Sequence, residues 1–172
     1  MHKPITIAFY FLILTSVSFS QSLWELGAEY QHPIGRGASE NIAGIRLENF
    51  RNKSSFSIGL TYNFASKSYS EYKGFGIYAG YRYAFAIQEK GNIFGGLRTA
   101  FTFINFAGKE RVNSISFFPS AEAGYHFNLR KHWFAAPAIG YGYTIKLTKE
   151  YNSLQEDEGG RFIPSVSAGY RF

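Results

Sequence analysis

Bulky apolar residues alternate with small or polar ones along most of the chain. Residues 55–64, SFSIGLTYNF, show the pattern most clearly, because every second side chain is large and apolar. A period of two predicts a β-strand with two unlike faces. Beyond the first twenty or so residues, no segment shows a sustained helical period. The pattern therefore predicts an all-β chain.

The alternation returns in eight segments. They run from Trp24 to Tyr30, Ala43 to Leu47, Phe56 to Phe64, Phe75 to Phe85, Ile93 to Phe103, Ile115 to Phe127, Trp133 to Leu147 and Phe162 to Phe172. A tilted strand of about ten residues is long enough to cross a bilayer. Longer connections alternate with shorter ones, which predicts four longer loops at one end and three short turns at the other. Three prolines, Pro119, Pro137 and Pro164, fall inside the segments, and we expect them at bulges or ladder ends.

The two faces differ in size as well as polarity. The polar face is mostly small: Gly27, Gly44, Gly59, Gly76, Gly80, Gly96, Ser120, Gly124, Gly140, Gly142, Ser165, Ser167 and Gly169. Alternation alone also fits a soluble barrel with its apolar face inward, but such a barrel would carry Lys and Glu outside. Small side chains suit the inside of a narrow cylinder. We therefore expect the apolar face to contact lipid and the sheet to close, since unpaired edges in lipid cost several kcal/mol per group.

Large aromatic residues gather at both ends of the apolar face. At the turn end they are Trp24, Phe56, Tyr83, Phe85, Phe127, Trp133, Tyr170 and Phe172; at the loop end they are Tyr30, Tyr62, Phe64, Phe75, Phe103, Phe117, Tyr143 and Phe162. Two such rings are typical of the aromatic belts at the two surfaces of a membrane barrel.

Charged residues within the strands all fall on the polar face. They are Glu25, Glu29, Arg46, Glu48, Arg82, Arg98, Glu122, Lys146 and Arg171. Acids and bases are nearly balanced, as a buried and paired network requires. Glu25, Glu48 and Arg171 lie near the turn end of neighbouring strands, and Arg98 and Glu122 lie near mid-height on adjacent strands. We expect ion pairs in both places.

The N-terminus has the features of a secretory signal peptide, which we assign to residues 1–20. A short basic start is followed by an apolar run from Ile5 to Leu14, too short to span a bilayer as a helix, and by a plausible cleavage site at 18–20. The barrel domain is then expected at 23–172.

Composition excludes several classes of function. There is no cysteine, and the net charge of +6 is scattered without a Lys/Arg run, so we expect no disulfide and no nucleic-acid partner. His126 is expected to face the lumen near the turns, and no nucleophile, base and orienting group can be assembled around it. The acidic run 155–160 lacks the ligand spacing of a calcium loop. We therefore expect no enzyme, metal or cofactor.

With its signal peptide, eight strands and terminal Tyr170-Arg171-Phe172, the chain resembles the small eight-stranded bacterial outer-membrane β-barrels. The resemblance covers 23–172 and implies an antiparallel up-and-down transmembrane barrel in the outer membrane of a Gram-negative bacterium. In that family a terminal aromatic residue, preceded by apolar residues at alternate positions, is the signal read by the barrel-assembly machinery. Val166, Ala168, Tyr170 and Phe172 fit this signal, and strand addition is the mode of recognition that it implies.

Three functions remain open at this point. The first is a non-enzymatic, monomeric barrel that displays extracellular loops to an unknown ligand, for adhesion, binding or envelope integrity. The second is a narrow channel for ions or small apolar solutes, although eight strands leave a lumen that side chains just fill. The third is a soluble secreted ligand carrier with the apolar face inward.

Overall fold

The computed structural model describes residues 23–35, 38–67, 72–107, 111–130, 132–147 and 158–172. Its strands are β1 (Leu23–Gln31), β2 (Ile34–Gly35), β3 (Ala38–Arg51), β4 (Ser54–Lys67), β5 (Tyr72–Gln88), β6 (Gly91–Ala107), β7 (Arg111–Arg130), β8 (Trp133–Lys146) and β9 (Gly159–Arg171). Among these residues, no helix is long and apolar enough to cross a membrane.

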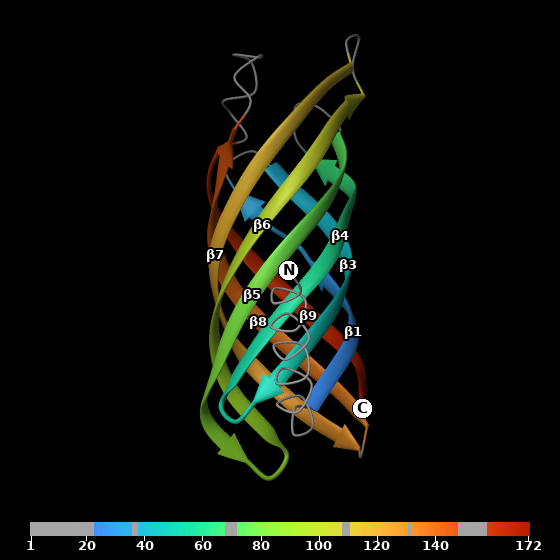
Figure 1. The fold of residues 1–172 in the computed structure, drawn as a ribbon. Coiled ribbons are helices and arrows are strands. Elements are labelled where there is room, and N and C mark those ends of the chain that lie inside the picture. The colour runs from blue at the N-terminus through green and yellow to red at the C-terminus, as the bar shows by residue number, and fades with distance from the viewer. Residues whose placement is uncertain (1–22, 36–37, 68–71, 108–110, 131, 148–157) are drawn as a thin grey trace, which may run out of the picture.

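The strands form one closed antiparallel sheet. β1 pairs with β3, each strand from β3 to β8 pairs with the next along the chain, and β1 also pairs with β9, so that the sheet returns on itself (Figure 1). The segment β2 continues β1 after a break at His32 and Pro33, and it likewise lies between β3 and β9. The nine segments therefore make an eight-stranded up-and-down barrel, which confirms the predicted fold class.

The two ends of the barrel differ. The turns at 52–53 and 89–90 are each two residues long by the strand bounds, and the short connection between β7 and β8 includes residue 131, which lies outside the described residues. Backbone hydrogen bonds join Trp24 to Phe172 in both directions, at 3.1 and 2.9 Å, so the start of β1 and the C-terminus meet at this same end (Figure 1). At the other end, residues 36–37, 68–71, 108–110 and 148–157 of the predicted loops lie outside the described residues.

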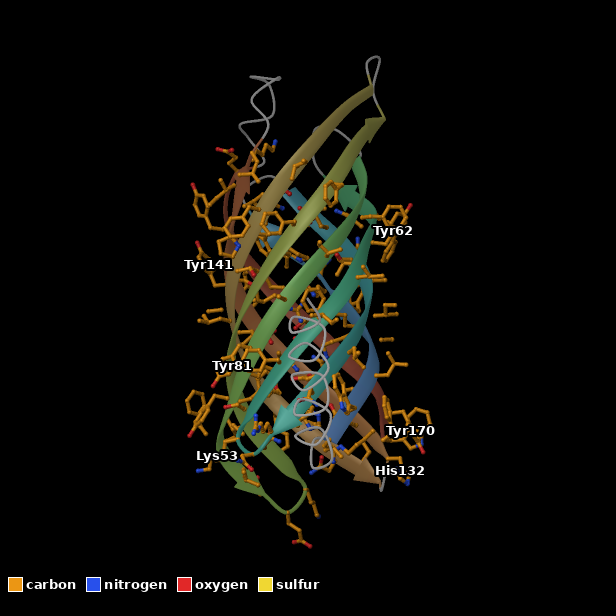
Figure 2. The ribbon with its side chains drawn as sticks, in the orientation of Figure 1. Lys53, Tyr62, Tyr81, His132, Tyr141 and Tyr170 are labelled. Carbon is orange, nitrogen blue, oxygen red and sulfur yellow. The ribbon has the colours of Figure 1, made fainter. Side chains whose placement is uncertain are left out.

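The apolar face points outward and the polar face inward. Phe56 is 66% exposed and Leu60 is 56% exposed, whereas Arg46 and Glu48 are almost completely buried. Figure 2 shows the aromatic side chains projecting from the outside of the barrel, among them Tyr62, Tyr81, Tyr141 and Tyr170. Among the described side chains, no residue on the outer face of the strands carries a charge away from the turns. The predicted orientation of the two faces is therefore correct.

Several strands are longer than the ten or so residues read from the alternation. The strands β5 and β6 have 17 residues each and β7 has 20. Residues predicted as connections, such as 104–107 and 111–113, extend the ladder instead. A hairpin continues pairing in water without needing an apolar face, so the sequence pattern fades before the strand ends.

Proline interrupts the ladder without shifting its register. The pairing of β7 with β8 omits the rungs at 118–119 and at 125–126, next to Pro119 and opposite Pro137, and resumes each time in the same register. Pro164 lies beside the break after β1, where its carbonyl oxygen accepts the His32 N–H at 3.0 Å. A proline has no backbone N–H and cannot donate a ladder hydrogen bond. The ladder is interrupted beside each of these prolines, where this donor is absent.

Candidate functional site

Six charged residues form one continuous chain of ion pairs across the lumen. The contacts are Arg46–Glu48 at 2.9 Å, Glu48–Arg82 at 3.3 Å, Arg82–Glu122 at 2.6 Å, Glu122–Arg98 at 4.0 Å and Arg98–Glu29 at 3.0 Å. Glu29 lies on β1 and Arg98 on β6, four strands apart in either direction round the barrel. The Arg98–Glu29 pair therefore spans the full width of the lumen.

A second cluster lies at the turn end. Arg171 Nη2 lies 2.6 Å from Glu25 Oε1, and His126 Nε2 lies 3.0 Å from Glu25 Oε2. The His126 ring stacks on Phe134, with centroids 5.1 Å apart and planes at 14°. Glu48 was expected near Arg171, but among the described residues its ion pairs are with Arg46 and Arg82 instead. Because Arg171 lies on β9 and Glu25 on β1, this ion pair connects the last strand to the first.

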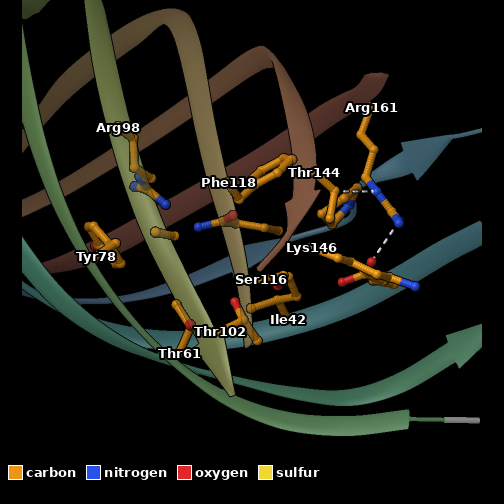
Figure 3. Close-up of a pocket in the computed structure, with 14 residues that line it drawn as sticks. Ile42, Thr61, Tyr78, Arg98, Thr102, Ser116, Phe118, Thr144, Lys146 and Arg161 are labelled. Carbon is orange, nitrogen blue, oxygen red and sulfur yellow. Dashed lines mark hydrogen bonds and ion pairs between the residues drawn. The ribbon is translucent and has the colours of Figure 1, made fainter. Parts of the chain in front are cut away.

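A third cluster at the loop end includes two residues that the sequence reasoning missed. Arg161 Nη1 lies 2.6 Å from Glu40 Oε1. Its Nε donates to Thr144 Oγ1 at 2.9 Å, and Figure 3 shows these two residues side by side. Asn63 Nδ2 also donates to Glu40, at 2.9 Å. Glu40 and Arg161 stand at the alternate positions of β3 and β9 whose side chains point inward. The same alternation could therefore have identified them from the sequence. Lys146, which was predicted for the lumen, lines the cavity beside this cluster.

Aromatic rings pack against the guanidinium groups inside the lumen. Tyr78, Phe94 and Phe134 are buried on the inner face. The guanidinium carbon of Arg98 lies 4.0 Å from the Tyr78 ring centroid, that of Arg82 lies 4.4 Å from Phe94, and that of Arg46 lies 5.7 Å from Phe134. Such cation–π contacts are strongest where water is excluded. Rings and ion pairs together fill the middle of the barrel.

Glycines of the inner wall make room for these rings. A Cβ added at Gly59 would overlap the Tyr78 ring, and one added at Gly124 or Gly27 would come within 2.8 Å of Phe94 or Phe134. Gly142 stands in the same way against Phe118, at 2.7 Å. The small inward residues therefore do more than fit a narrow cylinder: four of them form slots in the wall for large side chains.

The Gly59 slot leads to the first prediction. Gly59→Ala is expected to lower the free energy of unfolding by about 1–3 kcal/mol, because the new methyl group displaces the packed Tyr78 ring. Gly80→Ala is the matched control, since its Cβ would approach only the rotatable Ser57 Oγ at 2.6 Å and otherwise Leu97 O at 3.6 Å. Urea titration of both variants in lipid vesicles measures the difference, and equal losses would contradict the slot.

Two cavities lined by described residues lie on either side of the filled centre. The loop-end cavity, of about 50 Å³, reaches down to Tyr78 and Arg98 (Figure 3). The turn-end cavity, of about 270 Å³, reaches up to Glu48, Arg82 and Phe94. The two share no lining residue, so the ion-pair chain and its rings lie between them as a plug.

The described residues show no cluster suited to catalysis on a metal. No group of three or more His, Asp or Glu side chains among them is placed to hold a metal ion. His126 contacts a carboxylate and two aromatic rings, those of Phe134 and Phe50. These contacts hold the imidazole in the wall of the lumen.

Comparison with known proteins agrees with this architecture. No family model matches the sequence, and no curated protein matches it. Neisserial surface protein A matches with a TM-score of 0.63 and 17% identity, over 88% of this chain and 96% of that chain. The N-terminal β-barrel domain of Pseudomonas aeruginosa OprF matches with a TM-score of 0.62 and 12% identity, over 87% and 97%. Ail of Yersinia pestis, in complex with the heparin analogue sucrose octasulfate, matches with a TM-score of 0.53 and 16% identity, over 88% and 97%.

These identities show the fold and nothing finer. The chain has the fold of the small eight-stranded outer-membrane β-barrels, as the sequence resemblance predicted. With its uncharged apolar exterior and charged lumen, the protein is a membrane β-barrel.

Proposed function

We propose that the protein is a non-enzymatic, monomeric outer-membrane barrel that acts through what it displays at the loop end and not through its lumen. The observation that carries this proposal is the Arg46-to-Glu29 chain of ion pairs with its three stacked rings, which separates the two lumen cavities. A lumen divided in this way supports the display of a surface better than the passage of a solute. Adhesion, binding of an extracellular ligand and envelope integrity are the roles open to such a surface.

The extended hairpin of β6 and β7 supports this proposal. Its ladder continues from the belt-level pair Phe103↔Ile115 to Ala107↔Arg111. The two strands reach further than their neighbours at this end in Figure 1. We call residues 104–107 and 111–114 the β6–β7 ribbon. A paired ribbon beyond the apolar wall presents a pre-ordered edge at lower entropic cost than a free loop.

The charge at the loop end bears on the ligand. The segments joining strands there, with the adjoining strand ends, carry six basic residues (Arg36, Lys67, Lys73, Lys109, Arg111 and Lys149) and six acidic residues (Glu71, Glu110, Glu150, Glu156, Asp157 and Glu158). This balance gives no net attraction for a polyanion, so the sulfated sugar bound to Ail is not carried over to this chain.

The display proposal is tested by two variants in the native bacterium, in a strain lacking the protein. One variant replaces 104–114 by a two-residue turn; the other, Arg98→Met with Glu29→Leu, removes the charge pair across the lumen. Adhesion to an immobilised cell layer and uptake of the dye N-phenylnaphthylamine are measured. The variant without the β6–β7 ribbon is expected to assemble but not to restore wild-type adhesion or wild-type exclusion of the dye. The Arg98→Met, Glu29→Leu variant is expected to restore the property that the first variant lacks. The opposite result would favour the lumen as the functional part.

Electrical recording tests the channel alternative directly. The wild-type protein in a planar bilayer is expected to show no steady unitary conductance at 1 M KCl, because buried ion pairs and rings block the bore. A steady open channel in the wild type would contradict the plug.

Export and assembly form the remaining part of the proposal. We propose that residues 1–20, which lie outside the described residues, are a cleaved signal peptide. We also propose that Val166, Ala168, Tyr170 and Phe172 are read by the barrel-assembly machinery. Val166 and Tyr170 on β9 are 45% and 42% exposed, and Phe172, the residue directly after β9, is 63% exposed. That strand would be the free edge until it pairs with β1.

Phe172→Ala separates an assembly signal from a simple belt residue. The fraction of protein assembled in cells is expected to fall severalfold, while the stability of protein refolded in vitro changes by less than about 1 kcal/mol. Phe127→Ala removes a comparable turn-end aromatic side chain, 41% exposed, and is expected to assemble normally. Heat-dependent gel mobility of the membrane fraction reports the assembled fraction, and equal behaviour of the two variants would contradict the signal.

A further inference from the structure

The net positive charge of the protein is concentrated at one place. The lumen holds six basic residues (Arg46, Arg82, Arg98, Lys146, Arg161 and Arg171) and five acidic ones (Glu25, Glu29, Glu40, Glu48 and Glu122). The loop end, as counted above, is balanced, and Lys3 belongs to the predicted signal peptide. The three turns carry five basic residues (Arg51, Lys53, Lys90, Arg130 and Lys131) against the single acid Glu89. The turn end therefore holds an excess of four positive charges, out of the five that remain of the net charge of +6 when Lys3 is set aside.

The described basic residues at this end are exposed at the rim, where Lys53 also lines the turn-end cavity. Arg51, Lys53 and Lys90 are all exposed, on the turn between β3 and β4 and on the turn between β5 and β6. These two turns are separated round the rim by the full width of β4 and β5. Asn52, at φ 57°, makes the tight turn that carries Lys53 beyond the end of the ladder. The charges are therefore spread along the rim instead of forming one compact pocket.

This rim adjoins the part of the wall that contacts lipid. Phe85, Trp133 and Phe172 are 66%, 57% and 63% exposed at the turn end. Figure 2 shows Lys53, His132 and Tyr170 at the same end of the barrel. Aromatic belts lie at the level of lipid headgroups, so basic side chains just beyond the belt reach the phosphate groups of the adjoining leaflet.

We propose that the turn end is a binding surface for anionic phospholipid headgroups in the leaflet that it adjoins. Each exposed basic residue near an anionic lipid surface raises the association constant by about fivefold at low salt, and the free-energy contributions of several such residues add. A diffuse rim next to an apolar wall suits a lipid, whose chains contact the wall while its headgroup meets the charge. A free anion would gain only the weak and separate contacts of single side chains. The turn end would then fix the depth and direction of the barrel in an asymmetric membrane.

Intrinsic fluorescence provides the test, because the only two tryptophans, Trp24 and Trp133, both lie at the turn end. The folded full-length mature protein is placed in phosphatidylcholine vesicles containing a fixed minority of phosphatidylglycerol. Bromine on the acyl chains of one lipid or the other quenches those tryptophans that it contacts. The two quenching series give the association constant of phosphatidylglycerol relative to phosphatidylcholine at the turn end.

The relative association constant is expected to be about fivefold or more at low salt and to fall toward one in 0.5 M salt, where the charges are screened. The triple variant Arg51→Gln, Lys53→Gln and Lys90→Gln is expected to bring it close to one at low salt. The matched control, Lys67→Gln with Lys73→Gln at the loop end of β4 and β5, leaves it unchanged.

Two results would overturn the proposal. One is a wild-type constant of about one at low salt, measured without any substitution and therefore independent of whether a variant folds. The other is a salt-sensitive preference that the triple variant retains and the loop-end control loses. The lipid preference and its salt dependence do not depend on what the loop end binds, so this test stands apart from that of the proposed display function.

Discussion

Arg98→Ala is expected to lower the free energy of unfolding by about 3–5 kcal/mol, the range for breaking a buried ion pair by removing one partner. Arg98 is the residue that joins opposite walls: its Nη2 lies 3.0 Å from Glu29 on β1 and 4.0 Å from Glu122 on β7. Its guanidinium also covers the Tyr78 ring. Without it, the buried Glu29 carboxylate loses its ion pair and keeps the Gln31 amide donor at 3.0 Å and the Coulombic attraction of Arg46.

A paired substitution separates the loss of the ion pair from the loss of packing. Arg98→Met with Glu29→Leu removes both charges while keeping the volume, and is expected to recover most of the stability, since a well-packed apolar pair often replaces a buried ion pair without cost. Glu122 keeps its contact with Arg82 at 2.6 Å in both variants. Urea titration in vesicles measures all three proteins. A loss below about 1 kcal/mol for Arg98→Ala would mean that the lumen is wet and the plug is loose.

Leu60→Arg is expected to destabilise the barrel by about 2–4 kcal/mol, the cost of a cation on the lipid face near the bilayer midplane. Leu60 is 56% exposed on the outer wall, in the register row that joins Ile45 on β3 and Ile77 on β5. Its neighbours on this row are apolar on both sides. The introduced guanidinium has no carboxylate within the same outer face to neutralise it.

The adjacent residue is the matched control. Thr61 points inward and lines the loop-end cavity, near Glu40 and Arg98. Thr61→Arg therefore crowds the lumen instead of charging the lipid face, and is expected to cost less and to be insensitive to bilayer thickness. The same folding titration in bilayers of two thicknesses distinguishes them. Equal tolerance of the two arginines would refute the assignment of the faces.

Alternation was enough to predict the strands and their faces. The side-chain period of a strand is two, so one apolar parity defines the outer wall even without any contact information. The segment 55–64 shows this: Phe56, Ile58 and Leu60 are all exposed on the barrel, and Ser55 and Ser57 are buried. The closed order of strands then followed from the need to pair every edge in lipid.

Contacts across the lumen could not be predicted in the same way. Arg98 pairs in register with residues on β5 and β7, so the sequence predicted an ion pair with Glu122 on β7. The shorter contact of Arg98 is with Glu29 on the opposite wall. Which long side chains meet across a bore depends on its width and on strand stagger, and neither quantity is local in sequence. The nine charges could be assigned to the lumen from their parity, but most of their partners could not.

Tyr78, Phe94, Phe118 and Phe134 were overlooked although a signal was present. They stand on the small, polar parity, where a large ring is out of place unless the lumen has room for it. The glycines of that parity were read as evidence of crowding, whereas Gly59, Gly124, Gly142 and Gly27 are the sites that these rings occupy. Gly59 faces Tyr78 and Gly124 faces Phe94 in the register of adjacent strands, so a ring opposite a glycine is the joint pattern that would have revealed these two contacts of the plug.

A bulge limited the prediction at the turn end. The pairing of β5 with β6 shifts between Ala84 and Ala86, leaving Phe85 as the extra residue. Residues beyond it change face, so Ile87 lines the turn-end cavity instead of the outer wall. The strand also continues to Gln88, past Phe85, where the alternating segment of the sequence ends. Nothing in the alternation of a short segment marks such an extra residue.

The described strands close into a barrel whose outer wall meets lipid, and the other inferences about the protein depend on this arrangement. The most direct test is the gel mobility of detergent-extracted membrane protein, unheated and boiled. A closed barrel resists the detergent, so the unheated protein should migrate faster than the boiled protein. Before extraction, the protein should remain in the membrane fraction when the membranes are washed with carbonate. One band of unchanged mobility, or protein recovered in the aqueous fraction without detergent, would contradict the account.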